Sequence, residues 1–224
     1  MTTTHAPRAI IFDLDGTLVD TVGTRVESWM AVFPRFGIEP DPEFLAPLMG
    51  SDGKYLARMV AEEYGVKLQP GDDAEIDRQA GAEFRVLNAN PRVLPAVHDT
   101  LEWLTDQGMP WAVATSSLPD DARESVQAIG LRSMPIICDG ADVEHAKPAP
   151  DLLLKAAGLL DVDPARSWYV GDSRWDMVAA KAADMRAIAV LTGATTPEAL
   201  AEAGAEVIYP TMAEFRAEIP PAQR

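Results

Sequence analysis

The sequence has very little cysteine, and it cannot form a disulfide within the chain. Cys138 is the only cysteine among 224 residues, so the fold is stabilised without internal disulfide bonds. This scarcity is typical of a reducing compartment. The N-terminus, MTTTHAPRA, lacks the basic and apolar segments of a secretory signal. We therefore expect a cytoplasmic location.

Basic residues and long apolar runs are also scarce. The chain has 19 lysines and arginines against 35 aspartates and glutamates, which gives a formal net charge of −16. A surface this acidic repels nucleic acids and anionic membranes, so we expect neither as a partner. No apolar run approaches the ~20 residues of a membrane-spanning helix. An anionic small molecule can bind such a protein only where a metal ion or a local cationic pocket offsets the negative charge.

Short apolar runs alternate with helical patterns over most of the chain. Helical periodicity is found over 95–107, 119–129, 150–160 and 175–184. The runs themselves are largely continuous in apolar character and bounded by turn residues, which is typical of buried strands. They lie at 8–13, 110–115, 134–139, 167–172 and 186–191. Such alternation predicts an α/β fold with a parallel sheet covered by helices on both faces. Ligand sites in these sheets lie beyond the carboxyl ends of the strands.

The alternation is interrupted between residues 20 and 90. This stretch has helical periodicity and no convincing strand. The segment PRVLP (91–95) is expected to return to the core, because its prolines disfavour a helix. The pattern predicts a helical domain over 20–90, inserted into a core domain made of 1–19 and 91–224. We expect the C-terminal IPPAQR to be a loose tail.

Two aspartates follow the first predicted strand, in the motif DLDGT. Asp13 lies at the end of the strand and Asp15 in the turn that Gly16 permits. An aimed, partly desolvated carboxylate can act as a nucleophile, and a second carboxyl beside it can carry protons. Two clustered carboxylates raise each other's pKa unless a cation offsets their repulsion. The alternative interpretation is an ordinary turn capped by aspartate.

Three further motifs supply hydroxyls, a cation and two more carboxylates. VATSS places Thr115 and Ser116 at the beginning of a predicted helix, where hydroxyls and free amides bind phosphate or simply cap the helix. AKPAPD holds Lys147 in a stiff turn, either as a positive charge for a phosphoryl group or as a solvated lysine. YVGDSRWD offers Asp172 and Asp176 as oxygen ligands for Mg²⁺, or as acids that favour the helix dipole.

The order and position of these motifs resemble the haloacid dehalogenase-like hydrolase superfamily over nearly the whole chain. FDLDGTLVDT, KPAPDLLL and YVGDS are most similar to the branch that includes phosphoglycolate phosphatase, sugar phosphatases and β-phosphoglucomutase. The resemblance implies a Rossmann-like parallel sheet core with an inserted α-helical cap. It also implies a Mg²⁺-dependent phosphatase that hydrolyses a small organophosphate monoester through an aspartyl-phosphate intermediate.

The resemblance further implies a role for each motif residue. Asp13 attacks phosphorus, and Asp15 protonates the leaving oxygen and then activates water. Mg²⁺ is bound by the carboxylates of Asp13 and Asp172 and by the backbone carbonyl of Asp15. Asp176 positions the motif lysine or a metal-bound water. The residues expected to hold the phosphoryl oxygens are Thr115, Ser116 and Lys147, with Thr115 and Lys147 counted in the catalytic set.

Two basic residues of the predicted cap are candidates for substrate binding. Arg25 lies where related sequences often carry a histidine or tyrosine, and β-phosphoglucomutase uses a histidine there for proton transfer. A guanidinium is a poor base, which argues against a mutase, but it can bind a carboxylate or a second phosphate. Lys54, in the turn MGSDGK, is placed to contact substrate over the closed site. A solvated position is the alternative for both residues.

Two other functions stay open at this point. A sugar phosphomutase similar to β-phosphoglucomutase would pass the phosphoryl group to a sugar rather than to water. A regulatory protein could keep the fold without turnover, although the complete motif set argues against it. The sequence leaves open which phosphate ester is the substrate and whether the protein is a monomer or a dimer.

Overall fold

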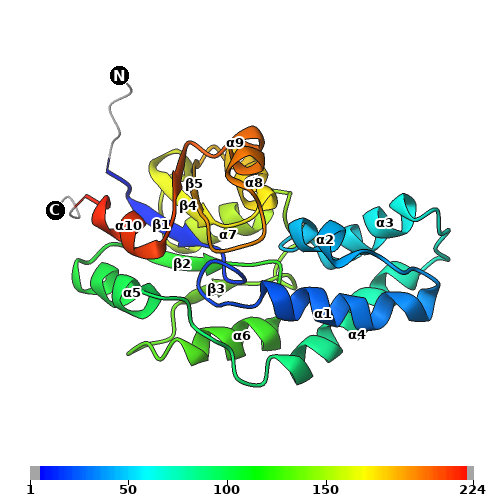
Figure 1. Cartoon of the computed structure of the whole chain (residues 1–224). Helices are drawn as coiled ribbons and strands as arrows, with labels where there is room; N and C mark the ends of the chain where they lie inside the picture. The colour runs from blue at the N-terminus through cyan, green and yellow to red at the C-terminus, as the bar shows by residue number, and fades with distance from the viewer. Residues whose placement is uncertain (1–5, 221–224) are drawn as a thin grey trace.

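A parallel sheet forms the centre of the larger part of the molecule, in a computed structural model that describes residues 6–220 (Figure 1). Neighbouring strands pair in parallel throughout, in the order β3-β2-β1-β4-β5-β6. The strands β1 to β6 are Ala9–Phe12, Trp111–Ala114, Ile136–Cys138, Ser167–Gly171, Arg186–Val190 and Val207–Tyr209. The predicted α/β class and the parallel sheet are confirmed.

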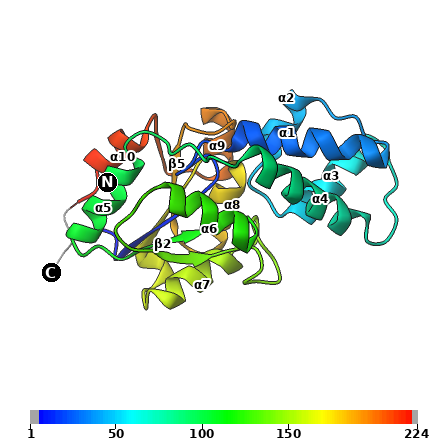
Figure 2. The ribbon, with the colours of Figure 1, turned by 90° about the horizontal axis from the view of Figure 1, so that it is seen from below.

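Helices cover both faces of the sheet (Figures 1 and 2). One face packs against α5 (Val97–Asp106), α6 (Pro119–Ala128) and α10 (Met212–Ala217), and the other against α7 (Asp151–Leu159), α8 (Arg174–Ala182) and α9 (Pro197–Ala203). Alternate residues of β1 serve the two layers, since Ile10 and Phe12 lie in one apolar cluster and Ile11 in the other. Burial on both faces explains why the strands read as continuous apolar runs.

Strand β6 was not predicted from the sequence, and the other predicted strands are longer than the observed ones. Strand β6 pairs only with β5, and its three residues are only partly buried. A short, half-buried edge strand lacks the continuous apolar signal of the central ones. The predicted strands also took in Asp13, Thr115 and Asp172, which directly follow β1, β2 and β4. These polar side chains leave the ladder to face the carboxyl edge of the sheet.

A helical layer inserted after β1 lies beside the sheet (Figures 1 and 2). It encloses an apolar cluster of its own, which includes Trp29, Phe33 and Ile76. Its α-helices are α1 (Val22–Val32), α2 (Pro42–Leu45), α3 (Gly53–Glu63) and α4 (Asp72–Leu87), and the 3₁₀ turns are η1 (Phe33–Phe36) and η2 (Ala46–Leu48); a third turn, η3 (Pro164–Arg166), precedes β4 in the core. The expected α-helical cap is therefore present. The domain boundaries at 19/20 and 90/91 stay a prediction.

The chain leaves and re-enters the core at adjacent points. The amide of Asp20 donates to the carbonyl oxygen of Arg92 at 2.7 Å, and the amide of Leu94 donates to that of Leu18 at 3.0 Å. The two chain segments that join the helical layer to the core therefore lie side by side. A pair of adjacent connections is typical of a hinge between two rigid parts.

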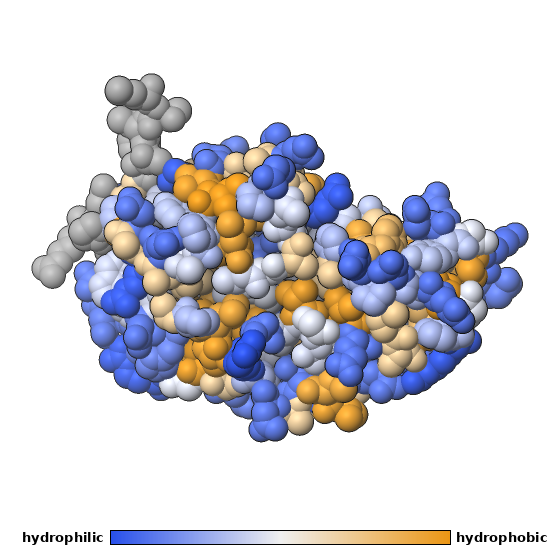
Figure 3. All heavy atoms as spheres, in the orientation of Figure 1, coloured by the Kyte–Doolittle hydropathy of each residue, from blue (hydrophilic) through white to orange (hydrophobic). Residues whose placement is uncertain are grey.

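The surface and the chain end agree only in part with the sequence analysis. Figure 3 shows a mostly hydrophilic face with separate apolar patches. None of the helices within residues 6–220 is long and apolar enough to cross a membrane. The expected loose tail was wrong for Ile219, which is buried in the core. The rest of that tail, from residue 221, lies outside the described residues.

We predict that Phe215→Ala destabilises the protein by about 3–5 kcal/mol. Phe215 is fully buried on α10, and its ring centroid lies 6.1 Å from that of Phe12 and 5.7 Å from that of Tyr209. Urea denaturation measures the free energy of unfolding. Leu159→Ala, on the exposed side of α7, is the control and should change this free energy by no more than ~0.5 kcal/mol. Equal effects of the two substitutions would contradict this account of the core.

Candidate active site

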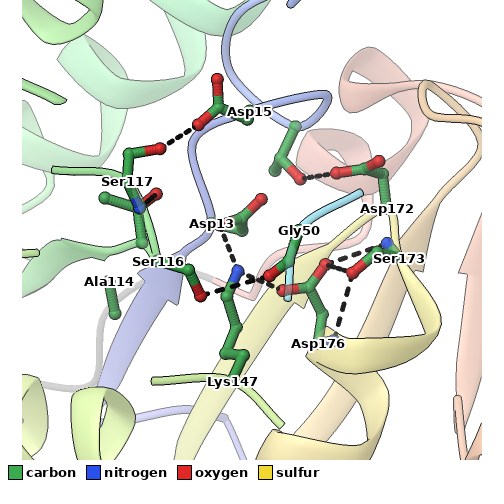
Figure 4. A network of polar contacts seen from close by, with 12 residues as sticks. Asp13, Asp15, Gly50, Ala114, Ser116, Ser117, Lys147, Asp172, Ser173 and Asp176 are labelled. Carbon is green, nitrogen blue, oxygen red and sulfur yellow. Dashed lines mark hydrogen bonds and ion pairs between the residues drawn. The ribbon is translucent and has the colours of Figure 1, made fainter. Parts of the chain in front are cut away.

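A buried lysine lies between two carboxylates at the carboxyl edge of the sheet (Figure 4). The Nζ atom of Lys147 donates to Oδ1 of Asp13 at 2.5 Å and to Oδ1 of Asp176 at 2.7 Å. Lys147 has no exposed surface, so the alternative of a solvated lysine is wrong. Asp13 directly follows β1, and Asp176 belongs to the first turn of α8. Residues far apart in the sequence therefore converge on one ammonium group.

Asp172 completes this cluster from the end of β4. Its Oδ1 accepts a hydrogen bond of 2.7 Å from the hydroxyl of Thr17. A Cβ at Gly193 would lie 1.7 Å from Oδ2 of Asp172, and one at Gly16 would lie 2.4 Å from the same atom. Only glycine lets the backbone approach the carboxylate this closely. The two loops thus form a cradle around Asp172.

Charge in this cluster is unbalanced. Burial raises the pKa of Asp13 to about 7, because it outweighs the opposite effect of Lys147. Burial, together with the charges of Asp176 and Asp13, raises the pKa of Asp172 well above its usual value. Burial alone would lower the pKa of Lys147, but its two carboxylate partners raise it. One ammonium therefore stays charged among three carboxylates that it cannot neutralise.

The same carboxylates suit a hard divalent cation. One oxygen from each of Asp13, Asp172 and Asp176 can be chosen so that all lie within 4.8 Å of one another, and all three residues are buried. Oxygen is the donor that Mg²⁺ and similar ions prefer. The glycine cradle holds Asp172 in place for this role. The structure therefore fits a divalent cation among three carboxylates proposed from the sequence, those of Asp13, Asp172 and Asp176.

The carboxylate of Asp15 points away from this cluster, toward the cap. It accepts a hydrogen bond from Ser117, as Figure 4 shows. It also accepts from Thr21 at 2.6 Å and from Arg25 Nη2 at 3.1 Å. Burial alone would raise the pKa of Asp15, but these donors, with Arg25 the strongest, lower it overall. Asp15 is thus held as an anion, and only its backbone carbonyl remains for the metal role predicted from the sequence.

Arg25 is occupied by protein groups rather than solvated. Besides Asp15, its Nη2 donates to the hydroxyl of Ser117 at 2.7 Å, and its guanidinium carbon lies 3.4 Å from the ring centroid of Phe84. Ser117 was missed as a site residue in the sequence analysis, although it is the last residue of the VATSS motif. Which of two adjacent serines faces the site depends on the turn after β2.

The remaining predicted residues line one cavity of about 170 Å³ together with Asp13, Asp15 and Lys147. Thr115 is buried at the end of β2, and its hydroxyl accepts from the amide of Ser117 at 3.1 Å. Ser116 donates to the carbonyl oxygen of Gly50, on the cap, at 3.2 Å. Lys54 lines the cap side and is exposed. Asp176 alone of the predicted set lies behind the cavity, in contact with Lys147.

The cap is docked on the core around this cavity. The amide of Asp52 donates to the carbonyl oxygen of Lys147 at 2.8 Å, and the indole of Trp175 donates to that of Leu48 at 3.0 Å. Gly50 has a φ of 93°, and a Cβ there would lie 3.0 Å from the hydroxyl of Ser173. The loop at 48–53 therefore closes the cavity through backbone contacts.

Comparison with known proteins agrees with this geometry. The profile of haloacid dehalogenase-like hydrolases matches residues 10–190. The chain belongs to this family. Among solved structures, a hydrolase from Pseudomonas syringae is similar to this haloacid dehalogenase-like hydrolase, with a TM-score of 0.89, 26% identity, and coverage of 94% of this chain and 97% of that one. CbbY from Rhodobacter sphaeroides in complex with phosphate is also similar, with a TM-score of 0.77 and 27% identity. This match covers 93% of this chain and 96% of CbbY.

Curated relatives of this haloacid dehalogenase-like hydrolase carry phosphatase names. Probable phosphatase IndB of Dickeya dadantii is 34% identical, over 92% of this chain and 90% of the relative. Phosphoglycolate phosphatase 1 of Pseudomonas aeruginosa is 32% identical, over 89% and 75%. Fructose-1-phosphate phosphatase YqaB of Escherichia coli is 31% identical, over 81% and 95%. All three names indicate that the relative acts on phosphate esters. The second and third names specify different alcohols, glycolate and fructose.

We predict that Mg²⁺ raises the melting temperature of this haloacid dehalogenase-like hydrolase by about 3–6 °C at pH 8 and by much less at pH 5. Protons compete with the metal, because the pKa of Asp13 is raised to about 7 and that of Asp172 is also raised. Without metal, a raised carboxyl pKa favours the folded state at low pH, and this contribution is lost as the pH rises from about 4 to 7.

Differential scanning calorimetry measures this shift, and Asp172→Asn is the control that should abolish it. An equal shift at both pH values, or a full shift in Asp172→Asn, would refute the assignment of the carboxylate cluster to a metal.

Proposed function

We propose that this chain is a Mg²⁺-dependent phosphatase that hydrolyses small organophosphate monoesters through an aspartyl-phosphate on Asp13. The observation that carries this proposal is the fully buried ammonium of Lys147, 2.5 Å from Oδ1 of Asp13 beside a closed cavity. A buried ammonium beside a carboxylate of raised pKa at the end of a cavity is typical of a functional site. With a divalent cation among the carboxylates, such a site has the positive charge that a phosphoryl group requires. The phosphatase names of the relatives support the same reaction class.

Asp13 is suited to nucleophilic attack. Lys147 binds its Oδ1, and within residues 6–220 its Oδ2 takes part in no hydrogen bond, which leaves that atom for phosphorus. Attack forms the bond between Oδ2 and phosphorus and breaks the bond from phosphorus to the ester oxygen. Lys147 then offers positive charge to the phosphoryl oxygens, and Thr115 and Ser116 flank the same end of the cavity.

Asp13, Asp172 and the backbone carbonyl of Asp15 would hold Mg²⁺, which supplies positive charge against the phosphoryl oxygens. Asp176 acts behind these groups: it accepts from Lys147 at 2.7 Å and from the amide of Ser173 at 2.9 Å. In this position Asp176 orients Lys147 rather than the substrate.

Asp15 is placed to serve as acid and base. As an anion held by Arg25, it suits the second half of the reaction, in which it takes a proton from the attacking water. In the first half it must carry the proton that goes to the leaving oxygen. That state requires Arg25 to move away, and movement of the cap carries α1 and Arg25 with it. We assign the cap to residues 20–90, with Lys54 at the mouth of the cavity.

We predict that Asp13→Asn lowers phosphate release by at least ~10³-fold while leaving the fold intact, because an amide is a poor nucleophile. The measurement is phosphate release from a panel of small esters, with and without Mg²⁺. Asp184→Asn is the matched control: Asp184 is exposed, with a φ of 57° that asparagine tolerates. Activity retained in Asp13→Asn would refute the mechanism. Isomerisation of a sugar 1-phosphate with little free phosphate would instead indicate a mutase.

A further inference from the structure

The cap side of the cavity carries two carboxylates that the proposed mechanism does not use. Asp121 lies in the first turn of α6 and Asp77 in α4, and both line the cavity on the side of the loop at 48–53. Substrate atoms that reach this wall are those of the leaving alcohol, since the phosphoryl end is bound at Asp13 and Lys147.

Asp121 presents a buried oxygen that lacks a donor. The residue is only 2% exposed, and its Oδ1 accepts from Nη1 of Arg85 at 3.2 Å. Its Oδ2 has no hydrogen-bond partner among the described residues. Nη1 of Arg25 lies 3.9 Å from this oxygen, beyond hydrogen-bond distance. Burying an anionic oxygen without a hydrogen-bond donor costs free energy. A ligand that donates a hydrogen bond to this oxygen would therefore bind more tightly.

Asp77 also lines this cavity, and its carboxylate packs against the backbone of Gly53. Asp77 and Gly81 are four residues apart and share one face of α4. A Cβ at Gly81 would lie 3.9 Å from Oδ2 of Asp121, and one at Gly53 would lie 1.9 Å from Oδ1 of Asp77. Gly53 therefore lets the Asp77 carboxylate lie directly against the loop, and Gly81 lies next to Asp121. No hydrogen bond to Asp77 is found within residues 6–220.

The cations of this wall do not offset its acidity. Arg25 is bound by Asp15 and Ser117 and covered by Phe84. Lys54 is exposed at the cap side of the cavity. Asp52 and Glu144 add two more carboxylates to the lining. A leaving group with a carboxylate would therefore meet like charge, whereas hydroxyl or ammonium groups would meet free acceptors.

We propose that Asp77 and Asp121 form a leaving-group subsite that accepts hydrogen bonds from the substrate's alcohol. The protein accordingly prefers phosphate esters whose alcohol carries hydroxyl or ammonium groups over esters that carry a carboxylate. This inference rests on the proposed phosphatase function and names the substrate class for it. It also separates this chain from relatives named for phosphoglycolate.

Three esters of matched size test the proposal: 2-hydroxyethyl phosphate, O-phosphoethanolamine and 2-phosphoglycolate. They share a two-carbon alcohol and end in a hydroxyl, an ammonium and a carboxylate. We expect kcat/KM for at least one of the first two to exceed that for 2-phosphoglycolate roughly tenfold or more. The better of the two shows whether the subsite reads hydroxyl or ammonium groups. A preference for 2-phosphoglycolate overturns the proposal.

Asp77→Asn tests the residue itself. Asp77 is partly exposed, and asparagine keeps its shape, so the variant should fold. We expect the preference over 2-phosphoglycolate to shrink about fivefold or more, mainly through KM. The matched control is Glu75→Gln, which removes one negative charge from the outer face of the same helix, where Glu75 pairs with Arg78. An unchanged preference in Asp77→Asn, or an equal change in Glu75→Gln, overturns the proposal.

A fourth ester, p-nitrophenyl phosphate, separates the two levels of inference. Mg²⁺-dependent release from it, combined with a preference for 2-phosphoglycolate, refutes the subsite and keeps the phosphatase. No release from any of the four esters refutes the proposed function, and the subsite fails with it.

Discussion

The ion pairs of Lys147 with Asp13 and Asp176 are the interaction on which the rest of the site depends. Taking an ammonium and two carboxylates out of water is costly, and only close hydrogen-bonded contacts offset that cost. The parallel sheet makes the contacts possible, because it brings the ends of β1 and β4 and the loop before α7 to one edge. Removing the lysine would leave buried carboxylates with no cation among them, so its charge supports both the fold and the chemistry.

The cap contributes a further ion pair beside those of Lys147, between Arg25 and Asp15. Arg25 comes from the first cap helix and holds Asp15 as an anion, so the candidate acid/base and the position of the cap are linked through one side chain. The loop at 48–53 reaches the core through backbone groups and glycines rather than through long side chains. Asp77, Asp121 and Lys54 line the cavity that is closed in this way, and they surround the proposed leaving-group subsite.

Much of the fold was predictable because the pattern is strong where burial is complete. Five of the six strands, β1 to β5, were found from apolar runs, whereas β6, a partly buried edge strand of three residues, was missed. Asp13, Asp15, Thr115, Lys147 and Asp172 stand out in the sequence because each lies just after a predicted strand or in a turn, and the structure brings all five to one cavity. Ser117 and Asp121 were missed, since neither differs in pattern from an ordinary helix start.

Periodicity and local turn chemistry were enough to predict the class of sheet, the inserted helical segment and the order of the motif residues along the chain. Only the tertiary structure decided which charges meet. The Asp15 carboxylate turns to Arg25 rather than to the other carboxylates, Lys147 is buried rather than solvated, and Asp121 keeps an oxygen without a donor. Pairing of this kind depends on distances between residues that are more than 90 positions apart in some cases, as for Arg25 and Ser117. Periodicity and local turn chemistry carry no information about those distances, which the packing of cap against core sets.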